Sequence, residues 1–276
     1  MDMNEPVKII EPRSRLGIYA SLAEIWQYRE LLLMLAWRDY KILYRQTAIG
    51  IAWAVLQPIL ATVAFIFVFG RFKEITDTGI PYALFVFSGL IIWQFFANSV
   101  TDASGSLVAS SQMISKISFP RIVIPLAKIG TQFINLTSSA VILVVMMIYF
   151  QVTPSLLSIA WLIPILAALF IVSASLSVIL SAVNVKYRDI QYILPYFIQL
   201  GLFVSPVIYS AASLGKYSLL IKFNPLTGII DSFRAALFGL EFPALSFTFA
   251  STIALVLFFL AVYYFTKAER EFSDIL

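Results

Sequence analysis

Runs of uncharged, mostly apolar residues divide the chain into segments that are long enough to cross a lipid bilayer as helices. A helix needs about 20 such residues to span hydrocarbon about 30 Å thick. Charged residues mark the ends of the runs, as Arg45 and Arg71 do for the first. The charge-free stretch 129–185 is too long for one span and fits two, joined by a polar turn. The predicted spans cover residues 46–70, 78–101, 123–150, 159–183, 190–212 and 242–266.

Three segments outside the spans have patterns of their own. Residues 21–46 contain no Gly or Pro and place an apolar, aromatic stripe beside basic residues, which predicts a helix in the membrane interface. This helix either anchors the chain only or also docks a partner. The serine-rich segment 102–121 predicts either a solvated loop or a short cytoplasmic helix. Residues 184–189 read on composition as a charged turn.

The segment before the last span predicts a further helix that does not cross the membrane. Asn224 is a good N-cap, Pro225 suits the first helical position, and Gly239 suits the end. The helix between them is too short to cross a bilayer and too apolar for open water. A re-entrant or interfacial hairpin over residues 213–240 fits both properties.

Composition and charge support this architecture. Of the residues, 61% are hydrophobic and 12% are charged, whereas a soluble domain carries about 25% charged residues. With six spans, 14 of the 19 Lys and Arg residues fall on the side that holds both termini, which predicts that this side is cytoplasmic. We therefore expect an all-α integral membrane protein with six transmembrane helices. It has an N-terminal interfacial amphipathic helix within residues 1–45, a cytoplasmic gate or coupling helix, and a re-entrant periplasmic hairpin between the fifth and sixth spans. Residues 46–266 form the transmembrane domain, and 267–276 a cytoplasmic tail.

The missing residue types exclude much catalytic chemistry. The chain has no Cys and no His, so it offers no thiolate nucleophile, imidazole base or Cys/His metal site. No G-x-x-x-x-G-K-[ST] loop is present to hold the phosphates of ATP. No close pair of carboxylates suggests glycosyl transfer or hydrolysis. We expect a non-enzymatic protein without a metal or cofactor of its own, whose transport energy comes from another subunit.

One stripe in the fifth predicted span stands out. Tyr192, Tyr196, Gln199 and Phe203 are spaced four, three and four residues apart, so they share one face of a helix. Aromatic faces with a hydrogen-bonding neighbour suit the rings of sugars. Ordinary helix packing with a tyrosine belt at the membrane interface explains the same pattern.

The motifs together resemble the Wzm-type permease of polysaccharide ABC exporters. They occur in the family order and cover roughly residues 30–270. The matching segments are Trp37–Pro58, Pro81-Tyr82, Gly89–Asn98, Ile114–Arg121, Asn184–Asp189, Ser205–Tyr209 and Asn224-Pro225.

The resemblance implies a homodimer in the bacterial inner membrane, with both termini in the cytoplasm. Two copies of a separate ABC ATPase, with or without a carbohydrate-binding domain, would bind the ATP and Mg. The dimer would export undecaprenyl-pyrophosphate-linked polysaccharide of O-antigen type from the cytoplasm to the periplasm, with no nucleic-acid partner. A capsule or teichoic-acid exporter of the same fold is the nearest alternative. A membrane-embedded glycolipid-processing enzyme and a passive channel are others.

The resemblance also assigns roles to residues. Cations at the cytoplasmic mouth would bind the substrate head group, since a pyrophosphate needs positive partners: Arg38, Lys41, Arg45, Lys116 and Arg121. The glycan channel would be lined by Tyr192, Tyr196, Gln199, Phe203, Trp93 and Phe96. The contact with the ATPase would use Lys186, Tyr187, Arg188 and Asp189. The periplasmic gate would use Asn224, Pro225, Phe233 and Arg234.

Overall fold

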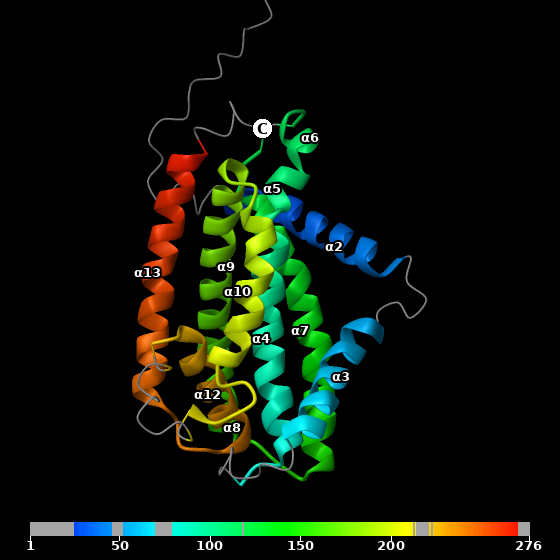
Figure 1. The fold of residues 1–276 in the computed structure, drawn as a ribbon, viewed down its shortest axis with the longest axis vertical. Coiled ribbons are helices and arrows are strands. Elements are labelled where there is room, and N and C mark those ends of the chain that lie inside the picture. The colour runs from blue at the N-terminus through cyan, green and yellow to red at the C-terminus, as the bar shows by residue number, and fades with distance from the viewer. Residues whose placement is uncertain are drawn as a thin grey trace, which may run out of the picture.

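The chain folds into a bundle of upright helices (Figure 1). The computed structural model describes residues 25–45, 52–69, 79–117, 119–211, 213, 221 and 223–269, and it has no strand within these ranges. The helices are α2 (Arg29–Arg45), α3 (Ala52–Phe69), α4 (Tyr82–Ser104), α5 (Ser106–Ala109), α6 (Ser111–Ile114), α7 (Val123–Tyr149), α8 (Leu156–Ala160), α9 (Leu162–Lys186), α10 (Ile190–Val204), α12 (Pro225–Phe238) and α13 (Ala244–Ala268).

Helix α4 forms the centre of the bundle. It is buried along most of its length and packs against α3, α7, α9, α10 and α12. Small polar residues let α9 approach it closely, and two of their side chains bond its backbone. The Ser177 hydroxyl donates to the carbonyl of Ser99 at 3.1 Å, and the Asn184 amide donates to that of Ser104 at 3.1 Å. Such close contacts are the usual means by which helices associate in a membrane.

Four of the described helices are long and apolar enough to cross a bilayer: α4, α7, α9 and α13. The first and fifth predicted spans correspond to the shorter apolar helices α3 and α10. Helix α10 ends at Val204, although the uncharged run continues to residue 212, because Ser205 precedes Pro206 and takes an extended conformation with ψ 144°. Residues 46–51, at the start of the first predicted span, lie outside the described residues.

The connections gather at two ends of the bundle (Figure 1). Helices α5 and α6, the turn after α9 and the end of α13 lie at one end, whereas α8 and α12 lie at the other. The chain passes between these ends through α4, α7, α9, α10 and α13 in alternating directions. Within the serine-rich segment 102–121, α5 and α6 form two short helices rather than an open loop.

Helix α2 rests against α7 and slants away from the bundle toward its C-terminal end (Figure 1). The hydroxyl of Thr131 donates to the Ala36 carbonyl at 3.2 Å, and Gly130 leaves room for the Ala36 methyl group. Tyr40 is buried, whereas Leu33 and Trp37 are exposed. The predicted apolar stripe therefore divides between the bundle and the surroundings.

Helix α12 has the boundaries that its sequence predicts. The Asn224 side chain accepts a hydrogen bond from the backbone N–H of Leu226 at 3.0 Å, and Pro225 opens the helix. Gly239 ends it in the left-handed conformation, with φ 68°. Its apolar face packs on α13, where Gly228 lies close to the carbonyl of Ser246. The first limb of the predicted hairpin falls largely on residues 214–220, outside the described residues.

Candidate functional site

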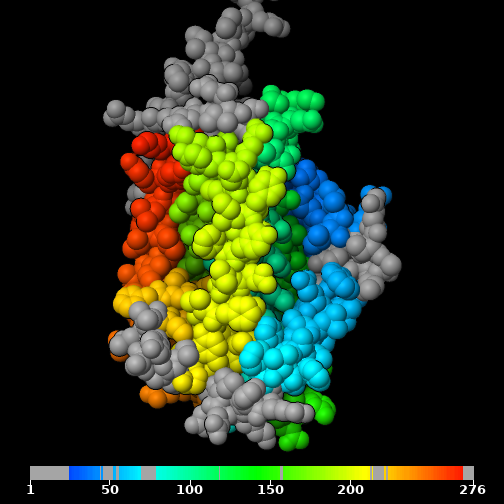
Figure 2. Space-filling model, viewed as in Figure 1, coloured from blue at the N-terminus to red at the C-terminus, as the bar shows by residue number. Residues whose placement is uncertain are grey.

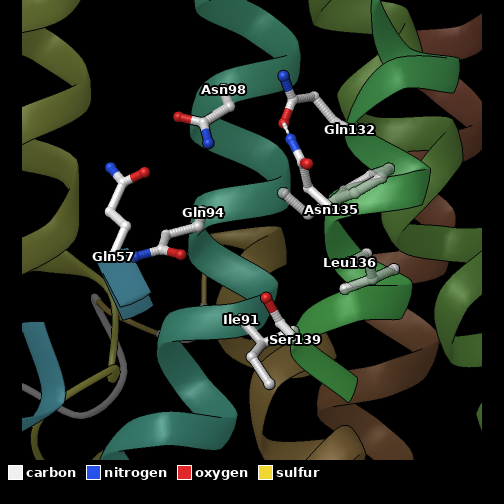
Figure 3. A pocket seen from close by; sticks show the side chains of 9 residues that line it. Gln57, Ile91, Gln94, Asn98, Gln132, Asn135, Leu136 and Ser139 are labelled. Atoms are coloured by element: carbon white, nitrogen blue, oxygen red, sulfur yellow. Dashed lines mark hydrogen bonds between the residues drawn. The ribbon is translucent and has the colours of Figure 1, made fainter. Parts of the chain in front are cut away.

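A small cavity between α3, α4 and α7 is lined mainly by amide side chains (Figure 3). Its volume is about 30 Å³, enough for one or two water molecules. The hydrogen-bonding residues of the lining are Gln57 of α3, Gln94 and Asn98 of α4, and Gln132, Asn135 and Ser139 of α7. Ile91, Phe95 and Leu136 complete it, so no charged side chain is part of the lining.

Helical spacing brings these side chains together at mid-depth. Gln94 and Asn98 lie four residues apart, so they project from the same face of α4. Gln132, Asn135 and Ser139 repeat at three and four residues along α7. Gln94 is the thirteenth of the 23 residues of α4, and Asn135 the thirteenth of the 27 of α7. The cavity therefore lies far from both ends of these two apolar helices.

Only part of this amide set is paired within the protein. The Asn135 side chain donates to Oε1 of Gln132 at 2.8 Å, and the Gln132 amide donates to Oδ2 of Asp102 at 2.7 Å. The side chains of Gln57, Gln94 and Asn98 form no hydrogen bond with any other described residue. Each neutral amide can both donate and accept. The cavity thus presents unused hydrogen-bonding capacity of both kinds.

Charged groups extend from the cavity toward α2. Nζ of Lys128 lies 2.8 Å from Oδ2 of Asp39, and Arg38 pairs with the other oxygen of that carboxylate, also at 2.8 Å. Burial alone would raise the pKa of the Asp39 carboxyl, but hydrogen bonds and charges from Lys128 and Arg38 together outweigh it and lower that pKa. Asp39 is therefore ionised at neutral pH, and its bridge to Lys128 fastens α2 to α7.

The five predicted head-group cations have different surroundings. Arg38 is paired with Asp39, Lys41 lies over the Trp37 ring at 5.3 Å, and the Arg121 guanidinium donates to the backbone carbonyl of Glu269 at 3.1 Å. Arg45 and Lys116 are exposed. Lys116 and Arg121 follow α6 at the end of the bundle that holds the α9–α10 turn, whereas the other three lie on α2 (Figure 1). Their role in binding a head group stays a prediction.

The aromatic stripe lies on the outer face of α10. This helix runs along the surface between α13 and α3 (Figure 2), and Tyr196 is 70% exposed. Tyr192, Gln199 and Phe203 are exposed as well. The stripe therefore does not pack inside this chain, which leaves it available to a ligand, to lipid or to a second subunit.

The other two predicted channel residues are buried. Trp93 is 6% exposed and lies against Gly201 of α10, where a Cβ atom would come within 2.8 Å of the indole ring. Phe96 packs beside Trp93, with ring centroids 5.7 Å apart. Trp93 thus lies beneath α10 rather than beside the exposed stripe. The assignment of both rings to the channel wall stays a prediction.

Arg234, a predicted gate residue, is 2% exposed. Its guanidinium donates to the carbonyls of Pro206 at 2.7 Å, Phe85 at 2.9 Å and Val207 at 2.7 Å. It also lies 3.5 Å from the centroid of the Phe85 ring. Burial lowers the pKa of Arg234 to about 10, so the side chain is still charged at neutral pH. Arg234 thus joins α12 to α4 and to the turn after α10, although the sequence places it in a connecting segment.

The other predicted gate and coupling residues fall at opposite ends of the bundle (Figure 1). Asn224 caps α12 and also donates to the hydroxyl of Ser205 at 2.9 Å, while Phe233 is buried in the core. Lys186 ends α9, and Tyr187, Arg188 and Asp189 form the turn before α10; all four side chains are exposed. The turn is shorter than the predicted 184–189, because residues 184–186 continue α9, and its contact with an ATPase stays a prediction.

The sequence of this bundle matches one known protein family. The ABC-2 type transporter family matches residues 30–238, from the second residue of α2 to the last of α12. The chain belongs to the ABC-2 transporter family.

Individual ABC-2 relatives align over nearly the whole chain. An O-antigen export system permease protein RfbA of Klebsiella pneumoniae is 31% identical over 252 residues, covering 90% of this chain and 95% of the relative. RfbA of Myxococcus xanthus is 27% identical over 255 residues, covering 91% and 97%. The polysialic acid transport protein KpsM of Escherichia coli is 23% identical over 244 residues, covering 84% and 91%.

Sequence patterns alone did not indicate the amide cavity of this ABC-2 chain. The predicted spans are defined by their lack of charged residues, and amides are uncharged. The available signal was polar side chains that recur at three and four residues inside apolar runs, as in α4 and α7. Nothing in the sequence showed that the two stripes face each other, or that Gln57 of α3 joins them.

Proposed function

We propose that the chain is the permease subunit of an ATP-driven ABC transporter that exports lipid-pyrophosphate-linked polysaccharide of O-antigen type. Its similarity to an O-antigen export permease over 90% of its own length and 95% of the relative is the observation that carries this proposal. The homodimer spans the bacterial inner membrane six times per subunit, α3 and α10 being the first and fifth spans. Two copies of an ABC ATPase bind ATP and Mg.

The two ends of the bundle suit different tasks in this export. The end with α5, α6 and the 187–189 turn faces the cytoplasm, where the ATPase docks and the pyrophosphate head group enters. Lys116 and Arg121 lie beside that entrance, and the α2 cations lie at the membrane interface. The end with α12 faces the periplasm, where the glycan leaves. Both chain termini then lie in the cytoplasm.

Deleting the coding sequence in the source bacterium tests the proposal. Surface O-antigen should disappear, and lipid-linked glycan should accumulate on the cytoplasmic side, because its synthesis continues while its exit is blocked. Re-expression together with an intact ATPase should restore export, whereas an ATPase with its P-loop Lys replaced should not. Unchanged surface O-antigen and no accumulated glycan in the deletion strain would contradict the proposal.

Capsule export is the second candidate, because KpsM, a polysialic acid transport protein, aligns over 84% of the chain. The deletion strain separates the two. Loss of the glycan on lipopolysaccharide supports the first proposal, whereas loss of capsule with intact lipopolysaccharide supports the second.

A further inference from the structure

The amide cavity lies at a depth where acyl chains could not satisfy its hydrogen-bonding groups. Gln94 and Asn98 are half-buried, and Gln57 is exposed, near the middle of the membrane-spanning bundle. A polar group that faces lipid without a hydrogen-bond partner costs several kcal/mol. The cavity is therefore best satisfied by water or by a polar ligand rather than by acyl chains.

Helix association does not account for Gln57, Gln94 and Asn98. Amides that hold transmembrane helices together do so by hydrogen-bonding across the interface. The side chains of Gln57, Gln94 and Asn98 reach into a common space from α3 and α4 (Figure 3), yet they form no such bond to another described residue. By contrast, Gln132 of α7 bonds Asp102 of α4, and Asn135 bonds Gln132. The unpaired members are free to bind something that enters.

The charge balance around the cavity indicates which polar ligand fits. The lining is uncharged. Two titratable groups lie beyond it: Asp102, which accepts from Gln132, and Lys128, whose Nζ lies 2.8 Å from Oδ2 of Asp39. Asp39 in turn also pairs with Arg38. The lining therefore offers a polyanion no cation to pair with, whereas the hydroxyls of a neutral sugar would find donors and acceptors there.

We propose that this cavity borders the path of the glycan, that Gln57, Gln94 and Asn98 hydrogen-bond sugar hydroxyls in passage, and that the cargo is an uncharged glycan. This inference rests on the proposed function and adds the location of a contact and the class of polymer. Neutral hydrogen bonds to hydroxyls are weak and the same for many sugars, so they allow a long chain to advance.

Access from water is the first test, and the chain has no native Cys to interfere. Gln94→Cys and Asn98→Cys are made in the full transporter and treated in membranes with a charged, membrane-impermeant methanethiosulfonate reagent. Both should be labelled because the path is hydrated. Val141→Cys on the exposed face of α7 is the control and should resist, since lipid covers it. If Gln94→Cys and Asn98→Cys resist labelling as fully as Val141→Cys does, the inference is overturned.

Export by apolar variants is the second test. Gln94→Leu and Asn98→Leu each remove one neutral hydrogen bond, worth about 1 kcal/mol or roughly a fivefold change in rate. Export should fall by about that factor while membrane abundance is unchanged, and Asn98→Gln should retain most of the rate. Val141→Leu serves as the control. Normal export in both variants, or abundance that falls in parallel with export, would overturn the inference.

The class of polymer is tested with two cargoes on the same undecaprenyl pyrophosphate anchor. One is a neutral mannose polymer and the other a polysialic acid of matched length, each produced in cells that carry the transporter and its ATPase. The neutral polymer should reach the surface, and the anionic one should not. Equal export of both would overturn the inference while leaving the proposed function intact. Export of neither would instead count against the proposed function.

Discussion

Arg234 is a cation that lies inside the protein, held by carbonyl groups rather than by a single counterion. Its planar guanidinium reaches three carbonyls at once, and Asp231 lies 3.7 Å away. Gly89 makes room for it, because a Cβ atom there would lie 2.6 Å from Nη2. The side chain and the glycine therefore form one packed unit between α4 and α12.

Replacing Arg234 should destabilise the protein strongly. Arg234→Leu leaves three buried carbonyls without a donor, and each lost partner costs about 1–3 kcal/mol. Arg234→Lys keeps the charge but lacks the guanidinium fork, so its loss should be intermediate. The melting temperature of purified protein in detergent measures both effects.

Lys267→Leu is the matched control, because Lys267 is an exposed cation in the last turn of α13. Its melting temperature should stay close to that of the wild type. An Arg234→Leu protein that is equally stable would show that the three hydrogen bonds contribute little.

At the scale of single elements, the outer face of α10 has two interpretations. It lines the path of the glycan, or it packs against another helix. Tyr196→Ala combined with Phe203→Ala removes two exposed rings from the predicted stripe. If the stripe lines the channel, surface polysaccharide should fall sharply while the amount of protein in the membrane stays normal. Quantifying both in the same cells tests this prediction.

Apolar exchanges at Ile193 and Leu200 serve as controls for the stripe and should leave export unchanged. A proportional fall in abundance and export of the double variant would show that the stripe is structural. A large-to-alanine change at a packed site typically costs 2–5 kcal/mol.

The exposed turn between α9 and α10 has its own test. Asp189→Arg or Arg188→Glu places the wrong charge at the predicted ATPase contact, so ATP hydrolysis should no longer drive export while the protein still inserts. Polysaccharide export and ATPase activity are measured in the assembled transporter. Glu241→Arg, an exposed reversal in the connection between α12 and α13, should have no such effect. Normal export by the turn variants would refute the coupling role.

Helix boundaries with strong local signals could be predicted from the sequence. The contacts between helices could not. Asn224, Pro225 and Gly239 determine the limits of α12 through caps that each involve only neighbouring residues. The end of α10 was placed too late because its run of uncharged residues continues past Pro206. The amide cavity depends on how α3, α4 and α7 are rotated against one another, and helical period alone does not determine that rotation.

At the scale of the whole molecule, the orientation in the membrane can be tested with single cysteines. Ser115→Cys and Arg188→Cys should react with an impermeant reagent only from the cytoplasm, and Glu241→Cys only from the periplasm. All three side chains are exposed. Asn184 is a poorer choice, because its side chain is 1% exposed. Labelling of Glu241→Cys from the cytoplasm would contradict the proposed topology.

The attachment of α2 has a consequence for how the protein is made. Its anchors on α7 are Lys128, Gly130 and Thr131. The ribosome adds them about 80 residues after α2 ends, a delay on the order of 10 s at typical rates of synthesis. During that time the exposed Leu33 and Trp37 can hold the helix at the membrane surface. The first helix of the described chain is therefore among the later ones to reach its final place.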